Sequence, residues 1–286
     1  MSIETVVHSR QLAEGASGEL LRFSRNEAGW EWMGFEVRRL AAGERWNYQR
    51  SGEETAFVLL SGKCSLKWAA GTEMIGGRNS VFDGLPYAVY LRAGDQAEFT
   101  AVNRCEIAAC HVPAAGNFSS QLITPKDVHV SLRGGGNASR QIVDVMRPDF
   151  PADRLIVVEV YTPGGNWSSY PPHKHDVHNP PAEVDLDEIY YYRMNRSGAF
   201  AHQRLYTADG KRDTVVTVHD GDAVLVREGY HPVVAGPGYD IYYLNFIAGS
   251  ARSLAITEDP NHVWIRGMWK EMDARLPLVK AAEASL

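Results

Sequence analysis

Short runs of apolar residues, broken at close intervals by turn residues, extend along the whole chain. The runs are rich in β-branched and aromatic side chains, as at residues 56–60, 155–160, 223–226 and 241–246. Between them fall 26 glycines and 14 prolines. Short strands with frequent turns are typical of an all-β sandwich or barrel. We therefore predict an all-β fold, with helical periodicity only over residues 264–284.

The two halves of the chain show a similar order of strands and turns. The pattern at residues 80–91 in the first half returns at 221–234 in the second. Residues 113–117, Pro-Ala-Ala-Gly-Asn, have the composition of a linker. We therefore predict two β-barrel domains in tandem, over residues 1–120 and 121–286.

Composition and charge narrow the classes of function. The 286 residues are 44% hydrophobic and 22% charged, as in soluble globular proteins. The formal net charge of −6 argues against a nucleic-acid partner, because phosphate binding requires a basic face. We expect no secretory leader and no membrane partner, since no apolar run approaches membrane-spanning length. The three cysteines lack Cys-x-x-Cys spacing, so we expect a reducing, cytoplasmic location.

Two histidines one residue apart, His173 and His175, are followed later by a third, His231. Side chains at i and i+2 share a face of a strand but lie on nearly opposite sides of a helix, so the pair can meet at one ion only on an extended backbone. Three imidazoles and one carboxylate suit one divalent zinc, manganese or iron ion. Glu183 and Glu188 are alternative sources of the carboxylate. We favour Glu188, which begins a β-like aromatic run, over Glu183 in a proline-rich loop.

Several segments resemble the 5-deoxy-glucuronate isomerases, which are bicupins of the cupin superfamily. The longest is residues 162–176, and residues 187–193 and 231–239 show the same likeness. In most cupins the glutamate follows the second histidine closely, whereas here Glu188 follows His175 by 13 positions. This insertion matches the isomerase family, and the likeness covers nearly the whole chain.

The resemblance implies a bicupin fold with one divalent metal ion in the C-terminal barrel, bound by His173, His175, Glu188 and His231. In the first half, Tyr48-Gln49-Arg50 stands where the second half has His-x-His, so we expect no metal there. The resemblance also implies conversion of 5-deoxy-D-glucuronate to 5-dehydro-2-deoxy-D-gluconate in myo-inositol catabolism, through a metal-chelated enediolate.

This reaction needs a group that moves a proton and a cation for the carboxylate of the substrate. Strand alternation places Tyr190 and Tyr192 on the same face as Glu188, so these tyrosines are our candidate catalytic residues. Arg204 and Arg227 are our candidates for binding the substrate. The residue that acts as the base is left open.

Three other functions fit the same donor set. They are a 4-deoxy-hexuronate ketol-isomerase of pectin breakdown, a cupin dioxygenase with a three-histidine, one-glutamate iron site, and a sugar-binding module without catalysis. The insertion at residues 176–187 favours the inositol route over the pectin route, and oxygen uptake would identify a dioxygenase. The expected partner is a small sugar acid, and exposed barrel edges would permit a homo-oligomer.

Overall fold

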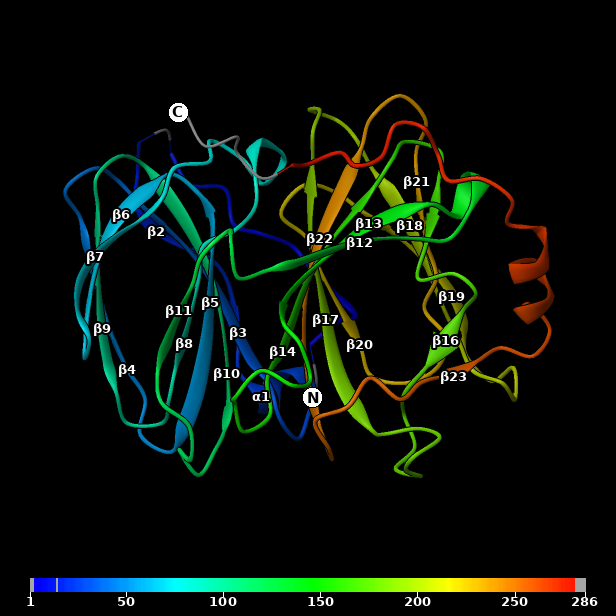
Figure 1. Ribbon diagram of the computed structural model, residues 1–286, viewed down its shortest axis with the longest axis horizontal. Helices are drawn as coiled ribbons and strands as arrows, with labels where there is room; N and C mark the ends of the chain where they lie inside the picture. Colours follow the sequence, from blue (N-terminus) through cyan, green and yellow to red (C-terminus); the bar gives the residue numbers. More distant parts are fainter. Residues whose placement is uncertain (1–2, 14, 281–286) are drawn as a thin grey trace.

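The computed structural model describes residues 3–13 and 15–280, and most of its regular structure is β-strand. The large sheets form four layers, which appear in order from left to right in Figure 1. Two layers belong to each half of the chain. The all-β prediction is therefore confirmed.

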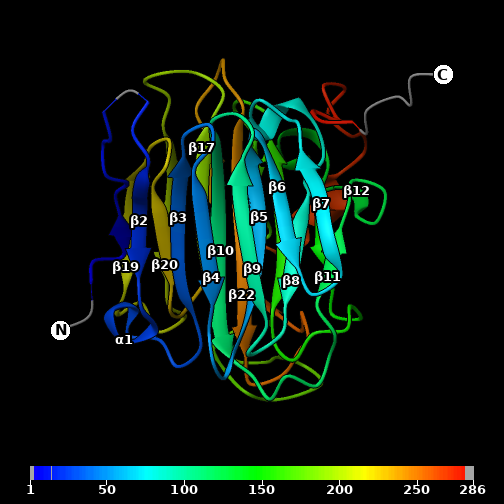
Figure 2. The same cartoon turned by 90° about the vertical axis from the view of Figure 1, so that its left-hand side faces the viewer.

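The N-terminal half contains a six-stranded inner sheet, which faces the other half, and a four-stranded outer sheet. The strand orders are β11-β8-β5-β10-β3-β2 and β4-β9-β6-β7. Figure 2 shows the outer sheet from outside. The inner strands are β2 (Gly18–Phe23), β3 (Gly34–Leu40), β5 (Glu53–Ser61), β8 (Ala88–Leu91), β10 (Cys105–Pro113) and β11 (Gln121–Ile123). The outer strands are β4 (Arg45–Gln49), β6 (Lys63–Trp68), β7 (Gly71–Gly76) and β9 (Gln96–Ala101).

The C-terminal half repeats this arrangement. Its inner sheet has seven strands in the order β1-β20-β17-β22-β14-β13-β12, and its outer sheets have the orders β15-β21-β18-β19 and β16-β23. The inner strands are β1 (Val6–Val7), β12 (His129–Arg133), β13 (Arg140–Met146), β14 (Ile156–Thr162), β17 (Leu186–Met194), β20 (Ala223–Val226) and β22 (Ile241–Gly249). The outer strands are β15 (Trp167–Ser168), β16 (His173–Lys174), β18 (Ala201–Tyr206), β19 (Asp213–Val218), β21 (Val233–Ala235) and β23 (Thr257–Glu258).

Within the described residues, the sheets do not close into barrels. The two layers of each half are separate sheets that face each other across an apolar core. The expectation of closed barrels is therefore wrong. Alternating apolar and polar positions cannot distinguish the two architectures, because a sandwich and a barrel both bury one face of each strand.

A third core joins the two halves. It lies between the two inner sheets and includes Phe35 and Tyr90 from one half and Ile189 and Phe246 from the other. The central strands of the inner sheets are consequently buried on both faces, and all nine residues of β22 are buried. Such strands are continuous apolar runs rather than alternating ones, which is the pattern seen at residues 241–246 of the sequence.

Two strands lie across the domain boundary predicted at residues 120 and 121. β1 pairs with β20 of the C-terminal inner sheet, through Val6 opposite Val224. β11 pairs with β8 of the N-terminal inner sheet, through Gln121 opposite Tyr90. The division at this boundary remains a prediction, and the N-terminal segment adds to the C-terminal sheet.

Helices are short. They comprise α1 (Arg25–Ala28) and the 3₁₀ helices η1 (Val81–Asp83), η2 (Gly136–Ala138) and η3 (Val263–Met268). The helix expected over residues 264–284 is thus limited to η3, and residues 281–284 lie outside the described residues. None of the side chains of η3 is buried, so tertiary packing does not stabilise a longer helix at this place. Within the described part of the chain, no helix combines the length and hydrophobicity needed to cross a membrane.

A buried ion pair links the halves at their shared core. Arg78, which follows β7, donates to Glu159 of β14, with Nη2 2.7 Å from Oε1, and the two side chains are 4% and 0% exposed. The hydroxyls of Tyr161 and Tyr242 donate to the same carboxylate at 2.8 and 2.9 Å. Arg78 also donates to the carbonyl oxygen of Leu59 at 3.0 Å. The buried carboxylate therefore has both a cation and hydroxyl donors, as a buried charge requires.

Candidate metal centre

Two histidines and a glutamate meet inside the C-terminal half. His175 follows β16, Glu188 lies on β17, and His231 lies between β20 and β21. Nε2 of His175 is 2.9 Å from Oε2 of Glu188, and Nε2 of His231 is 3.2 Å from the same oxygen. All three residues are buried. One atom from each lies within 4.8 Å of the others, so the three can bind one ion.

The outward-facing nitrogen of each imidazole fixes its tautomer. Nδ1 of His175 is 3.0 Å from the carbonyl oxygen of Leu186, and Nδ1 of His231 is 3.0 Å from that of Gly229. A carbonyl only accepts, so each Nδ1 carries a hydrogen and donates it. In the neutral rings both Nε2 atoms then present lone pairs to Glu188. Backbone carbonyls orient metal-binding histidines in this way.

Two lone pairs directed at one carboxylate oxygen repel unless a positive charge lies between them. Nε2 of His231 is buried and has no hydrogen-bond partner. Burial raises the pKa of Glu188, but the adjacent imidazoles of His175 and His231 outweigh burial and lower this pKa to about 2. Burial likewise opposes protonation of His175, yet Glu188 raises the pKa of that imidazole. The group therefore requires a proton or a cation, and its donors fit a divalent ion.

His173 lies beside this group. Its ring centroid is 4.8 Å from that of His231 and 6.3 Å from that of His175. Burial, followed by the neighbouring His231 and His175, lowers its pKa well below the usual value, which favours the neutral form that binds metals. Of the four predicted ligands, the structure thus places His175, Glu188 and His231 in one group and His173 beside it.

The loop between His175 and Glu188 explains which glutamate faces the histidines. Glu183 accepts from Nζ of Lys174 at 2.8 and 3.0 Å and from the amides of Asp176 and Val177. Its carboxylate is thereby occupied in holding the loop. Of the two alternatives, the structure places Glu188 in the group and Glu183 outside it.

The same loop supports the third histidine. Asp176 accepts from Nζ of Lys174 at 2.6 Å and from the amide of Gly229 at 2.7 Å. The carbonyl of Gly229 accepts from His231, so a continuous chain of contacts runs from the loop to that imidazole.

Known proteins show which family this architecture and these residues represent. A sequence model of the KduI/IolB family matches residues 6–265. A 5-deoxy-glucuronate isomerase from Geobacillus thermodenitrificans is 44% identical over 254 residues, which are 87% of this chain and 91% of that protein. The chain belongs to the KduI/IolB family.

Solved structures agree with this assignment. An IolB-like protein from Salmonella typhimurium LT2 superposes with a TM-score of 0.87 at 38% identity, over 92% of this chain and 99% of that one. An oxalate decarboxylase from Lactobacillus farciminis superposes with a TM-score of 0.62 at 10% identity, over 90% of this chain and 89% of its own. The second likeness concerns the fold alone, and it confirms the predicted bicupin architecture.

Both predicted catalytic tyrosines of this KduI/IolB protein face the interior of the C-terminal half. Tyr190 and Tyr192 lie in its core, whereas Tyr191 lies in the core between the halves, as strand alternation predicts. The ring centroid of Tyr190 is 5.7 Å from that of His231. Burial, followed by the charge of Glu188 for Tyr190, raises the pKa of each hydroxyl well above its usual value. Both tyrosines are therefore suited to donate hydrogen bonds and poorly suited to act as bases.

Two polar residues of the interior that contact these tyrosines, Ser169 and Gln203, were not among the predicted site residues. The hydroxyl of Tyr190 is 2.8 Å from that of Ser169, and the hydroxyl of Tyr192 donates to Gln203 at 2.8 Å. Gln203 also donates to the carbonyl oxygen of His231 at 3.2 Å. The sequence signal for Gln203 is the alternation along β18, which places this residue on the inward face of the strand.

The two predicted substrate-binding arginines bind partners outside the metal-ligand group. Arg204 is on the surface, where it pairs with Asp213 at 2.7 Å and stacks on Tyr206. Arg227 donates to the carbonyl oxygens of Ala28 and Ile3, so it binds the N-terminal segment. Their assignment to the substrate remains a prediction that these contacts do not support. Strand alternation alone cannot show which end of a sheet a long side chain reaches.

The N-terminal half has other residues at the equivalent positions. Thr55 and Glu188 both pair with the last residue of the neighbouring strand, Leu91 of β8 and Val226 of β20 respectively. The hydroxyl of Tyr48 lies 3.1 Å from that of Thr55, much as His175 lies against Glu188. A hydroxyl pair thus replaces the imidazole and carboxylate.

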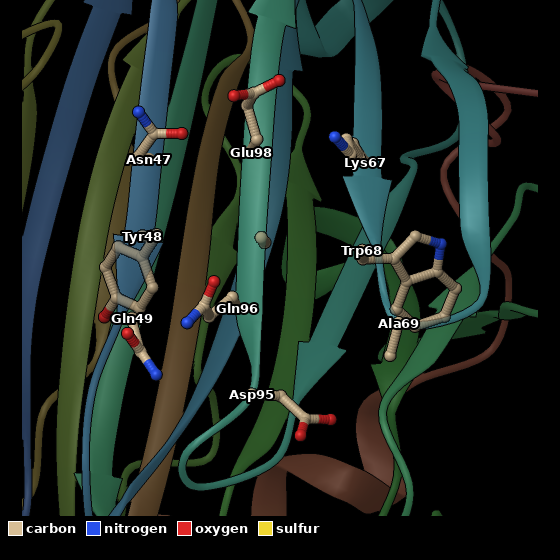
Figure 3. A pocket seen from close by; sticks show the side chains of 10 residues that line it. Asn47, Tyr48, Gln49, Lys67, Trp68, Ala69, Asp95, Gln96 and Glu98 are labelled. Carbon is tan, nitrogen blue, oxygen red and sulfur yellow. The ribbon is translucent and has the colours of Figure 1, made fainter.

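A hollow of about 700 Å³ lies on the outer face of the N-terminal half (Figure 3). Its lining includes Gln49, Lys67, Trp68, Gln96 and Glu98. The described lining contains neither histidine nor cysteine. The candidate metal ligands therefore lie in the C-terminal half and not at this hollow.

Proposed function

We propose that this protein is a metal-dependent aldose–ketose isomerase that converts 5-deoxy-D-glucuronate to 5-dehydro-2-deoxy-D-gluconate in myo-inositol catabolism. The observation that carries the proposal is the convergence of two oriented, buried imidazoles on Glu188 in a KduI/IolB chain. Relatives named as 5-deoxy-glucuronate isomerases match most of the chain. The proposed ligands are His173, His175, Glu188 and His231.

The reaction moves hydrogen between two adjacent carbons. The proton on C2 is removed and one is delivered to C1, while the hydroxyl proton passes from O2 to O1. C1 changes from an aldehyde to a primary alcohol, and C2 becomes a ketone. A divalent ion held by His173, His175, Glu188 and His231 would supply Lewis acidity where negative charge develops.

The surrounding side chains orient the reacting carbons and exclude water. The raised pKa of Tyr190 keeps its hydroxyl protonated, so that it donates a hydrogen bond to a substrate oxygen near His231. Tyr192 and Gln203 hold each other and the backbone of His231. Burial of these groups strengthens their electrostatic interactions relative to those in water.

Proton NMR with 5-deoxy-D-glucuronate tests the proposed reaction. We expect the aldehyde-derived signal to disappear and a new hydroxymethyl signal to appear, without oxygen uptake in a parallel oxygen-electrode assay. A 4-deoxy-hexuronate should react more slowly. Oxygen consumption, or faster turnover of the 4-deoxy sugar, would identify one of the alternative enzymes and contradict the proposal.

Removing the loop carboxylate that supports His231 should weaken metal binding. Asp176→Ala breaks the contacts to Lys174 and to the amide of Gly229. Loss of an outer contact of a metal ligand typically lowers metal affinity by about 10- to 100-fold. Competition against a chromogenic chelator measures this affinity. Asp209→Ala, in an exposed turn, serves as the control, and equal affinities of the two variants would contradict the supporting role.

A further inference from the structure

Arg140 is a partly buried arginine without a carboxylate partner. It begins β13, and strand alternation places it on the same face as Ile142, which lies in the core of the C-terminal half. Its Nη1 donates to the carbonyl oxygen of Ala138 at 3.1 Å. Within residues 3–13 and 15–280, no aspartate or glutamate oxygen lies within ion-pair distance of its guanidinium.

Two other arginines of the interior are paired with carboxylates. Arg78 pairs with Glu159, and Arg193 pairs with both Glu106 and Asp220. The pKa values of Arg78 and Arg193 are raised, whereas burial lowers that of Arg140. A cation withdrawn from water without an anion is costly, so such a side chain is expected to meet an anionic ligand.

The guanidinium of Arg140 is within electrostatic reach of interior tyrosines, one of which borders His231. The side chains that influence it electrostatically include Tyr243 and Tyr190. The ring of Tyr190 is 4.7 Å from that of Tyr243 and 5.7 Å from that of His231, measured between centroids. Tyr190 and Tyr243 thus connect the surroundings of Arg140 with the group that contains His231.

A glycine turn holds one edge of the guanidinium. Gly134 has φ +94°, and a Cβ at this position would lie 2.0 Å from the carbonyl oxygen of Ala138 and 3.0 Å from Nη1 of Arg140. The turn therefore packs against the arginine and leaves no room for a side chain. Since Nη1 is the only guanidinium nitrogen with a hydrogen bond to protein in the described residues, the Nε and Nη2 donors can take a carboxylate in the two-point geometry typical of arginine.

We propose that Arg140 binds the carboxylate of the sugar-acid substrate and so selects uronates over neutral sugars. This inference rests on the proposed function, because it requires the aldehyde end of the substrate at the His–Glu group. Arg140 is a substrate-positioning residue, and it takes the role that the sequence suggested for Arg204 or Arg227.

The test compares Arg140→Met with the wild-type protein on 5-deoxy-D-glucuronate and on the neutral 5-deoxy-D-glucose. Loss of a charge-assisted pair should lower kcat/KM for the acid by about 10- to 100-fold, mainly through KM. For the neutral sugar, kcat/KM should change by less than about threefold. Arg212→Met, which removes an exposed arginine paired with Glu228, is the control.

Arg140→Lys provides a second variant, since it retains the charge but not the two-point geometry. It should bind the acid less tightly than wild type and more tightly than Arg140→Met. Equal losses on the acid and the neutral sugar, or undiminished activity of Arg140→Met on the acid, would overturn the inference and leave the isomerase function intact.

If the wild-type protein turns over neither sugar, the proposed function fails. Calorimetric binding of D-glucuronate and D-glucose to wild type and Arg140→Met then tests Arg140 separately. Stronger binding of D-glucuronate that is lost in the variant supports the inference, and identical binding by both proteins contradicts it.

Discussion

Replacing His231 with alanine should lower turnover of 5-deoxy-D-glucuronate by about a thousandfold or more and reduce bound metal to a small fraction. A catalytic metal contributes several kcal/mol to transition-state stabilisation, and each ~1.4 kcal/mol corresponds to a factor of ten. His231 is fully buried, and its Nε2 has no hydrogen-bond partner. Its removal therefore deletes a proposed ligand whose orientation the fold maintains through Gly229.

His202→Ala is the matched control for this experiment. His202 lies on β18, opposite Val234 of β21, and its imidazole contacts Thr217 at the surface. We expect its metal content and kcat to remain within about twofold of wild type, as for most surface substitutions. Metal content by elemental analysis and turnover by NMR are measured on the same samples. Full metal content and activity in His231→Ala would remove this residue from the centre.

Replacing Arg78 with methionine should lower the free energy of unfolding by about 3–5 kcal/mol. The change leaves Glu159 charged and buried between the halves, and breaking one partner of a buried pair typically has this cost. The hydroxyls of Tyr161 and Tyr242 remain as donors but supply no positive charge. Urea unfolding followed by tryptophan fluorescence measures the loss.

Arg92→Met is the control for the core ion pair. Arg92 pairs with Asp95 at 3.0 Å, and its side chain is 48% exposed, so the change should cost less than about 1 kcal/mol. Similar unfolding free energies for the two variants would show that the buried pair does not hold the halves together.

Local pattern was sufficient to predict the face of β17. Alternation places Glu188, Tyr190 and Tyr192 together, because strand geometry fixes which side chains share a face. The extended His-x-His segment similarly brings His173 and His175 to one side. These inferences depend only on neighbouring residues. In the structure Tyr190 and Tyr192 lie in the core of the C-terminal half, and His173 lies beside His175.

Contacts between distant segments were harder to predict. The choice between Glu183 and Glu188 depends on how the loop folds back onto Lys174. Arg140 was not predicted, because its lack of a carboxylate partner depends on where distant aspartates and glutamates lie in the fold. The strand that carries it, β13, is also far from β17 in the sequence. The expected closed barrels and long C-terminal helix were wrong because alternation and weak periodicity do not specify sheet closure or helix packing.

The most direct test of the metal-dependent isomerase is to strip the purified protein with a chelator, assay it, and restore zinc, manganese and iron(II) separately. We predict that turnover of 5-deoxy-D-glucuronate disappears with the metal and returns when at least one of these ions is bound at one equivalent per chain. Undiminished turnover by protein shown by elemental analysis to be free of metal would contradict the account.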